Sequence, residues 1–367
     1  MTARRNKYNK VSVINKMWNM KRIAPLFVFI ILVFTALQSK AQVTDDIFRV
    51  LSDANSARVV ALGGMPLPVH DGDLQTAVFN PSAISPEMNN QIALSYVGDF
   101  NVGTNYATVQ YSRTFEKLGS FAASVQYYNY GNMPYASESG YVDGNTFSVS
   151  DYAITLGWGR ELSDKWSIGA NLKYAGLQYE SYHGGALAVD VAATYWSYTN
   201  WAFTLAARNI GMQLYNDFDN RNVKLPFSVD FMASKKLDHL PLTIYLAFDD
   251  IQQWNKIHTD TLVSPNYNPT TGQYEEPSNT AKFFTNLACH LVVGGELELG
   301  KNLVLRASYN YGTSYNMGVP QKRTLVGFSA GFGVKIKMFE IDYTRSRNNI
   351  VGSPNFLTIR IDLNKFK

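Results

Sequence analysis

The stretch Trp166-Ser-Ile-Gly-Ala-Asn-Leu-Lys-Tyr174 decides the fold, because apolar and polar residues alternate along it. Every second side chain of a β-strand points to the same face. One face would therefore carry only apolar residues, and the other only glycine and polar residues. The same period of two returns at 187–195 and 303–311, and it continues segment after segment from about residue 91 to the end. The chain is predicted to be all-β.

Strand length and loop length then distinguish a membrane barrel from a soluble sandwich, which also shows such alternation. We predict about fourteen strands, near 91–98, 104–115, 119–130, 146–160, 166–179, 186–197, 201–211, 225–235, 241–251, 283–298, 302–312, 325–336, 339–346 and 355–364. Many of them reach the roughly ten residues that a tilted bilayer-crossing strand needs. Short turns follow the even-numbered strands, and the longer segments 131–145, 212–224, 252–282 and 313–324 follow odd-numbered ones. This sorting is typical of outer-membrane barrels.

Residues 1–41 are predicted to be a secretory signal peptide cut between Ala41 and Gln42. A basic start leads into an apolar stretch at 23–37, which is followed by small residues. A transmembrane helix is the alternative, but the stretch is shorter than the roughly 20 residues needed to span a bilayer and contains Pro25. Without the eight basic residues of 1–41, 25 basic residues remain against 29 acidic ones, a formal charge of −4. Such a chain gives no support for nucleic-acid binding.

The sequence offers no catalytic, cofactor or metal site. The five histidines show no metal-ligand spacing. Alternation would point His290 into the lumen and Cys289 toward lipid. Because any barrel has polar residues in its lumen, we interpret His290 as an ordinary lumen residue and not as a catalytic one. Gly63-Gly64 would allow a tight bend, and Gly294-Gly295 a bulge or a close contact inside the barrel. Charges of both signs are expected in the lumen and would pair with one another: Arg160, Lys173, Asp190, Glu296, Glu298, Arg306, Glu340, Asp342, Arg360 and Asp362.

The segment 42–90 differs from the barrel region 91–367, since it has clusters of Asp, Gly and Pro. It is predicted to form a small N-terminal hatch or plug. Its stretch 56–64, followed by Asp71-Gly-Asp73 and by 77–83, resembles the "SAR-x-x-ALGG … NPA" opening of the PorV/PorQ family of type IX secretion proteins. The motif residues are Ser56, Ala57, Arg58, Ala61, Leu62, Gly63, Gly64, Asn80, Pro81 and Ala83. Ser82 stands where the commonest motif has Ala, and the stretches 91–97 and 105–111 resemble the PorQ branch.

The resemblance implies a barrel related to the FadL fatty-acid transporters, with fourteen strands and an N-terminal hatch, embedded in outer-membrane lipid. It further implies a non-enzymatic component without a cofactor, which holds surface partners of the cargo attachment complex. Those partners would be a PorZ-type protein, with a PorU-type sortase and a PorV-type shuttle. The long segment 252–282 is the candidate partner loop, with Tyr267, Asn268, Tyr274, Glu275 and Glu276 as candidate contacts. A FadL-type channel for a hydrophobic solute is the alternative, which the polar outer loops disfavour.

Overall fold

The computed structural model describes residues 47–99, 104–136, 142–217, 223–257, 267–268, 270, 272–274, 277–318, 325–348 and 352–366. The predicted signal peptide and its cleavage site at Ala41 and Gln42 lie outside these residues. Fourteen strands form one closed antiparallel barrel, in which each strand pairs with its chain neighbours and β16 pairs with β1. Closure leaves no strand edge unpaired in lipid. The predicted fold class is confirmed.

The strands are β1 Gln91–Asp99, β2 Thr104–Phe115, β3 Gly119–Ala136, β4 Val142–Ser163, β5 Trp166–Tyr179, β6 Tyr182–Trp196, β7 Trp201–Asn216, β8 Ser228–Lys236, β9 Leu242–Phe248, β12 Leu291–Leu299, β13 Leu303–Asn310, β14 Phe328–Ile336, β15 Phe339–Ser346 and β16 Asn355–Asp362. A separate hairpin joins β10 (Tyr267–Asn268) to β11 (Gln273–Tyr274). Among the described helices, none is both long and apolar enough to cross a membrane.

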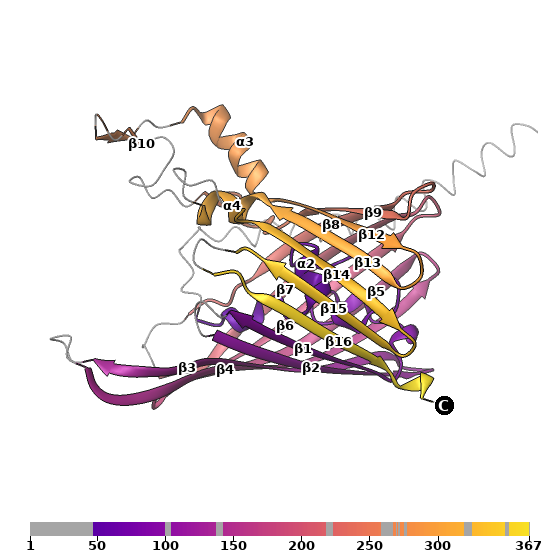
Figure 1. The fold of residues 1–367 in the computed structure, drawn as a ribbon, viewed down its shortest axis with the longest axis horizontal. Coiled ribbons are helices and arrows are strands. Elements are labelled where there is room, and N and C mark those ends of the chain that lie inside the picture. The colour runs from indigo at the N-terminus through magenta and orange to yellow at the C-terminus, as the bar shows by residue number, and fades with distance from the viewer. Residues whose placement is uncertain are drawn as a thin grey trace, which may run out of the picture. The chain divides into compact units, whose positions relative to one another are not determined.

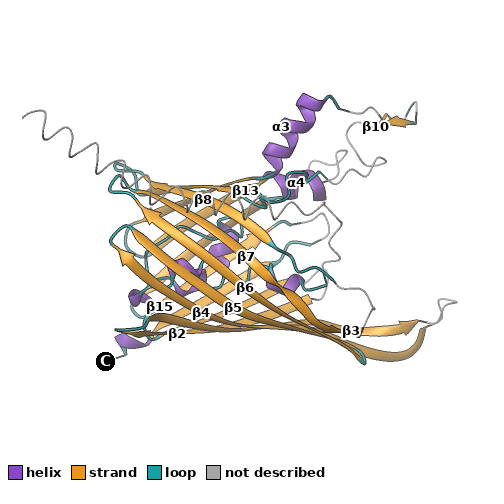
Figure 2. Ribbon diagram, turned by 180° about the vertical axis from the view of Figure 1, so that it is seen from behind, coloured by secondary structure: helices purple, strands orange, loops and turns teal. Residues whose placement is uncertain are grey.

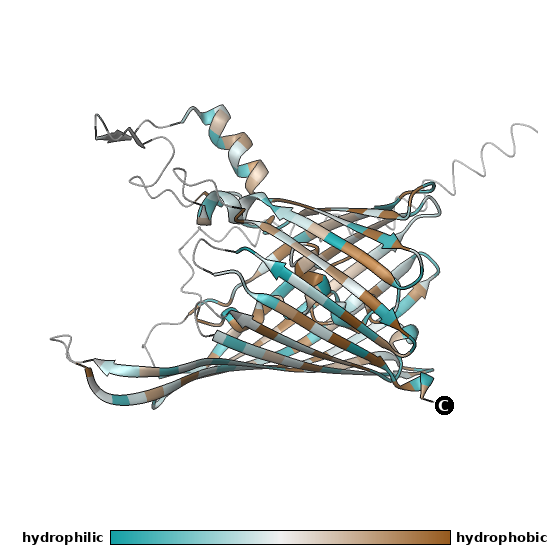
Figure 3. Ribbon diagram, viewed as in Figure 1, coloured by the Kyte–Doolittle hydropathy of each residue, from teal (hydrophilic) through white to brown (hydrophobic). Residues whose placement is uncertain are grey.

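The barrel wall has an apolar outer face and a polar inner face. In β5, Trp166 and Leu172 are each 47% exposed, whereas Asn171 and Lys173 are each 2% exposed. Figure 3 shows hydrophobic and hydrophilic residues alternating in bands along the strands. Apolar groups outside and polar groups inside are the arrangement that a lipid-embedded barrel requires.

The two rims of the barrel differ. The short turns and the C-terminal turn η5 (Leu363–Lys365) lie at one rim, which we call the turn end (Figure 1). The helices α3 (Asn279–Cys289) and α4 (Tyr311–Met317) lie at the other rim, which we call the loop end (Figure 2). In outer-membrane barrels, the rim with the longer loops is the extracellular one.

Several predicted boundaries at the loop end were wrong. Residues 131–136 and 142–145 are strand and not loop, because β3 and β4 continue as a paired ribbon as far as Ala136 and Val142. Residues 212–216 of the predicted loop 212–224 belong to β7, which runs on to Asn216. The predicted strands 225–235 and 241–251 also shrink, to Ser228–Lys236 and Leu242–Phe248.

Two helices replace predicted strand and loop at the same rim. The predicted strand 283–298 begins only at Leu291, because Ser278 caps a helix by accepting from the Ala281 amide. Similarly, Asn310 accepts from the Thr313 amide and caps α4. This helix takes up the end of the predicted strand 302–312 and the start of the predicted loop 313–324. Cys289 therefore ends α3 and is fully buried instead of facing lipid. His290, the C-cap residue of α3, is fully buried, with Nδ1 2.5 Å from the Asp249 carbonyl oxygen.

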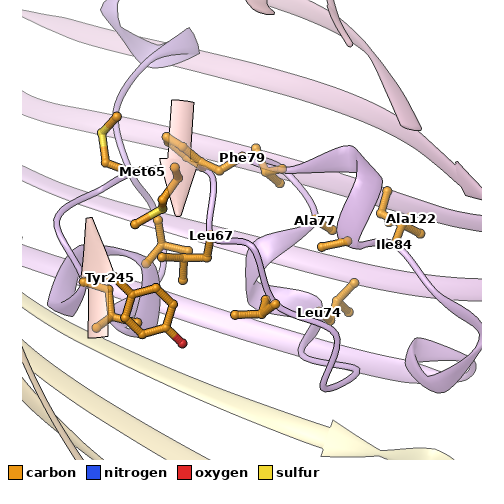
Figure 4. Packing of buried hydrophobic residues seen from close by; sticks show 14 of the residues in the cluster. Met65, Leu67, Leu74, Ala77, Phe79, Ile84, Ala122 and Tyr245 are labelled. Carbon is orange, nitrogen blue, oxygen red and sulfur yellow. The ribbon is translucent and has the colours of Figure 1, made fainter. Parts of the chain in front are cut away.

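Residues 47–90, the inner segment, occupy the lumen. They form η1 Arg49–Leu51, α2 Ala57–Ala61, η2 Leu74–Thr76, η3 Pro81–Ala83 and η4 Pro86–Met88. Helix α2 lies against β13 to β16, η3 against β4 to β6, and η4 against β2 and β3. An apolar cluster that includes Leu67, Leu74 and Phe79 packs with Tyr245 of β9 and Ala122 of β3 (Figure 4). Residues 42–46 of the predicted hatch lie outside the described residues.

Candidate functional site

A buried charge network joins the inner segment to the wall, and Arg58 is at its centre. The Arg58 side chain is 4% exposed and its Nη1 donates to Asp73 Oδ2 at 2.8 Å. Its Nη2 donates to Glu296 Oε1 of β12 at 3.2 Å and lies 2.5 Å from Asp71 Oδ2. Carboxylates from two parts of the chain therefore surround the guanidinium. An arginine supplies this fork of donors, which a lysine cannot reproduce.

The network continues around the adjacent strands. Arg306 of β13 pairs with Glu296 at 2.6 Å and also with Asp342 of β15. Gln75 of the inner segment donates to Asp342 Oδ2 at 2.5 Å, and Arg360 of β16 pairs with Glu340. The predicted mutual pairing of lumen charges is confirmed for these residues. Arg160 is an exception, because it is exposed on the outward register of β4.

The first half of the PorV/PorQ-like motif forms α2 and the bend after it. The Ala57 amide donates to Thr358 Oγ1 at 3.0 Å, and the Thr344 hydroxyl donates to the Ala57 carbonyl at 2.7 Å. Gly63 and Gly64 then turn the chain with φ values of +98° and +77°. The predicted tight bend is confirmed, and it needs glycine because other residues rarely adopt positive φ. Ser56, Ala61 and Leu62, the remaining motif residues here, are all buried.

Gly294 of β12 faces this bend. A Cβ on Gly294 would lie 3.5 Å from the Leu62 carbonyl oxygen, an ordinary van der Waals distance, so the contact is not close enough to require glycine. Strand β12 pairs with β9 and β13 without a register shift, so the predicted alternative of a bulge at 294–295 was wrong.

The second half of the motif, Asn80-Pro81-Ser82-Ala83, forms the η3 turn against β4, β5 and β6. Asn80 caps the turn by accepting from the Ser82 amide, and its Nδ2 donates to the Leu67 carbonyl at 2.8 Å. The Ser82 hydroxyl lies 2.7 Å from Thr194 Oγ1, which in turn lies 2.7 Å from Thr204 Oγ1. The departure from the commonest motif therefore adds a bond to the wall that an alanine would not make.

A cavity opens above the inner segment at the loop end. Its volume is about 690 Å³. Its floor includes Val60, Gly63 and Gly64, and its wall carries both aromatic and charged groups, among them Arg49, Asp53, Tyr106, Tyr128, Tyr130, Asp249, Asp250, Lys256 and Phe356. Tyr106 and Tyr128 stack with ring centroids 4.2 Å apart. A lining that mixes aromatic and charged groups suits a polar ligand with an apolar face better than it suits a purely apolar ligand.

One side of this cavity holds an acidic pair around a lysine. Lys256 Nζ lies 2.8 Å from Asp249 Oδ2 and 2.9 Å from Asp250 Oδ2. Burial raises the pKa of Asp249 to about 7 even though Lys256 opposes that shift. For Asp250, burial acts in the same direction, but the Lys256 ammonium, the hydrogen bond from Gln252 and the Arg208 charge together outweigh it and lower the pKa.

The candidate partner loop is described only in part. Tyr267 and Asn268 pair with Tyr274 and Gln273 as β10 and β11, while Glu275 and Glu276 lie outside the described residues. Helix α3, which follows, exposes Phe283 by 50% and Phe284 by 61%, and Trp254 packs beside Phe283. Sequence reasoning missed this aromatic surface, because 283–298 was interpreted as a strand.

No family model and no curated protein matches the chain. Solved structures do resemble it. The toluene transporter TodX of Pseudomonas putida is 11% identical, with a TM-score of 0.47 over 84% of this chain and 96% of that one. A Pseudomonas aeruginosa FadL homologue is 12% identical, with a TM-score of 0.46 over 84% and 98%. The KdgM porin is 5% identical, with a TM-score of 0.33 over 74% and 98%. The assignment to the PorV/PorQ family stays a prediction from the motif.

Proposed function

We propose that this protein is a non-enzymatic outer-membrane barrel that acts through its loop end, where it holds protein partners at the cell surface. The observation that carries the proposal is the fixed position of the inner segment. Arg58 and Gln75 bind buried carboxylates of β12 and β15, and the Ser82 hydroxyl lies within hydrogen-bond distance of β6. A segment held at so many points of the circumference favours an anchor over an open pore.

The finer proposal is a role in the type IX secretion system. The protein would anchor a PorZ-type surface protein, together with a PorU-type sortase and a PorV-type shuttle, in the cargo attachment complex. Support comes from the PorV/PorQ-like motif, whose residues from Ser56 to Ala83 belong to the inner segment and are mostly buried. Further support comes from the exposed aromatic pair Phe283 and Phe284, since aromatic residues are enriched at the centres of protein interfaces.

The test is an affinity pull-down of the tagged protein from native outer membranes, followed by mass spectrometry. One variant replaces 258–277 with a short Gly-Ser linker, which keeps Lys256 and the Ser278 cap of α3. The other is Phe284→Ala. The proposal predicts that surface sortase-complex proteins co-purify with the wild type and are lost or reduced with both variants.

The matched control is Tyr198→Ala, which removes an aromatic side chain that is 83% exposed at the turn end. This variant should retain every partner. Recovery of the wild-type barrel without surface proteins would overturn the scaffold role.

A FadL-type channel for a hydrophobic solute is the second candidate. The observation behind it is the loop-end cavity, where Tyr106, Tyr128 and Phe356 provide an aromatic wall in a space large enough for a small molecule, although the charged groups of the same lining suit a purely hydrophobic solute less well. Native mass spectrometry of the barrel in mild detergent separates the two functions. A solute bound at one per chain, with no surface proteins in the pull-down, would establish the channel.

A further inference from the structure

Three side chains that are far apart in the sequence meet at the turn end of the barrel. His70 comes from the inner segment before η2, Glu87 from η4, and Glu161 from the end of β4. Their ligand atoms all lie within 4.8 Å of one another. His70 Nε2 is 3.6 Å from Glu161 Oε1 and 3.9 Å from Glu87 Oε1. Spacing along the chain gave no sign of this cluster, because its members are separated by many residues.

The distances are close to those of a metal-binding site. An ion with four ligands at about 2.1 Å holds neighbouring ligand atoms about 3.4 Å apart. Rotations of these side chains would close the remaining gap. One imidazole nitrogen with two carboxylate oxygens is a donor set for Zn²⁺ and similar divalent transition metals, whereas Ca²⁺ and Mg²⁺ prefer oxygen ligands alone.

Neighbouring residues orient two of the three ligands. The Ser85 hydroxyl donates to Glu87 Oε2 at 2.9 Å, which leaves Oε1 directed at His70. The Trp196 ring packs on the His70 imidazole, with centroids 4.8 Å apart. Outer partners that fix the orientation of ligand side chains are usual at metal sites. The three side chains are 36%, 55% and 40% exposed, so an ion can enter from solvent and keep a water ligand.

We propose that His70, Glu87 and Glu161 bind one divalent transition-metal ion, with Zn²⁺ as the best fit. The ion would fasten the inner segment to β4 at the turn end. This is the rim opposite the proposed partner surface, so the test of the metal site and the test of the proposed function have independent outcomes.

The test uses the mature protein in detergent, with its affinity tag removed and bound metal stripped by a chelator. Isothermal titration with ZnCl₂ should give one ion per chain, and Co²⁺ should give the visible absorption of a low-coordinate nitrogen and oxygen site. His70→Ala and Glu161→Gln should each weaken Zn²⁺ binding by about tenfold or more. Zn²⁺ should raise the thermal unfolding midpoint of the wild type and leave that of His70→Ala unchanged.

Two variants at the same rim serve as matched controls. His239→Ala and Glu116→Gln each remove an exposed group from another short turn, and both should bind Zn²⁺ as the wild type does. Heat-modifiable migration on a gel verifies that each variant is a folded barrel. Absence of saturable Zn²⁺ binding, or equal binding by the wild type and by folded Glu161→Gln, would overturn the proposal. An equal loss in His239→Ala would overturn it too.

Discussion

The inner segment and the region around α3 both interrupt the strand pattern, yet they differ in what their residues contact. The inner segment buries its motif residues, and its polar groups bind the wall. Helix α3 instead leaves Phe283 and Phe284 exposed. The difference teaches that polar lumen side chains determine the position of one region, whereas the other is free to contact a partner. Changes in the first should therefore alter stability, and changes in the second should alter binding.

The largest loss of folding stability is expected for Arg58→Met. Because the substitution removes the central cation of a buried carboxylate network and leaves Asp73 with Arg360 and Glu296 with Arg306 only, the free energy of unfolding should fall by about 3–5 kcal/mol. Urea unfolding in detergent measures it. The matched control is Arg49→Met, which removes an exposed pair with Asp53 and should cost about 0–1 kcal/mol. Equal losses for the two variants would break the comparison.

A smaller effect is expected for Gly63→Ala. The new Cβ would lie 2.3 Å from Val292 Cγ1, on a backbone with φ of +98°. Gly300→Ala is the control, since Gly300 also has positive φ, at +72°, but has nothing within 4 Å of an added Cβ. Gly63→Ala should destabilise the barrel by about 1–3 kcal/mol more than the control does. Identical unfolding midpoints would show that the bend does not press against β12.

The pH dependence of stability tests the loop-end cavity. The folded-state pKa of Asp249 is raised to about 7, above the ordinary value of about 3.9. Between these two pH values the folded state binds more protons than the unfolded state does. The contribution of Asp249 to the free energy of unfolding is therefore lost as pH rises, by at most about 1.4 kcal/mol per pH unit. Lys256, Asp250, Asp230 and His290 surround the carboxylate.

Asp249→Asn removes that titration. The stability of this variant relative to the wild type should therefore increase between pH 5 and pH 8, as measured by urea unfolding at several pH values. Parallel curves for the two proteins would show that Asp249 is ionised throughout this range.

Ser82→Ala should cost about 0.5–1.5 kcal/mol, because it removes a buried hydroxyl that contacts Thr194. Ser52→Ala removes an exposed hydroxyl bonded to the Arg49 carbonyl and should change stability less. The difference between the losses of unfolding free energy in Ser82→Ala and Ser52→Ala measures how much the Ser82 hydroxyl stabilises the contact with the wall. A value near zero would make Ser82 equivalent to alanine.

The smallest effect on stability is expected for Phe284→Ala. This side chain is 61% exposed, so the free energy of unfolding should change by no more than about 0.5 kcal/mol. The same variant is predicted to lose surface partners. Strong destabilisation would mean that α3 supports the barrel, and the contrast between the two regions would then fail.

The fourteen strands could be predicted from sequence because lipid outside and polar groups inside enforce a strict alternation. The motif could be recognised, and the positive φ of Gly63 and Gly64 agrees with the bend expected there. Helix α3 could not be separated from the following strand, since 283–298 has enough apolar residues for either. The outward position of Arg160 was missed for a related reason, because alternation does not say which register a polar residue near a rim follows.

The pairings inside the lumen were out of reach for a different reason. Arg58 and Glu296 are joined only when the barrel closes around the inner segment, and no local pattern encodes that contact. The same holds for Ser82 and Thr194. Sequence alone could say that lumen charges would pair, but not which charge would face which.

Electrical recording in a planar lipid bilayer tests most directly whether the inner segment closes the barrel. The wild-type protein is predicted to show no steady conductance, because the buried contacts of Arg58, Gln75 and Ser82 keep the segment in the lumen. Arg58→Met should show transient openings under the same conditions. A steady, porin-like conductance of the wild type would contradict the account.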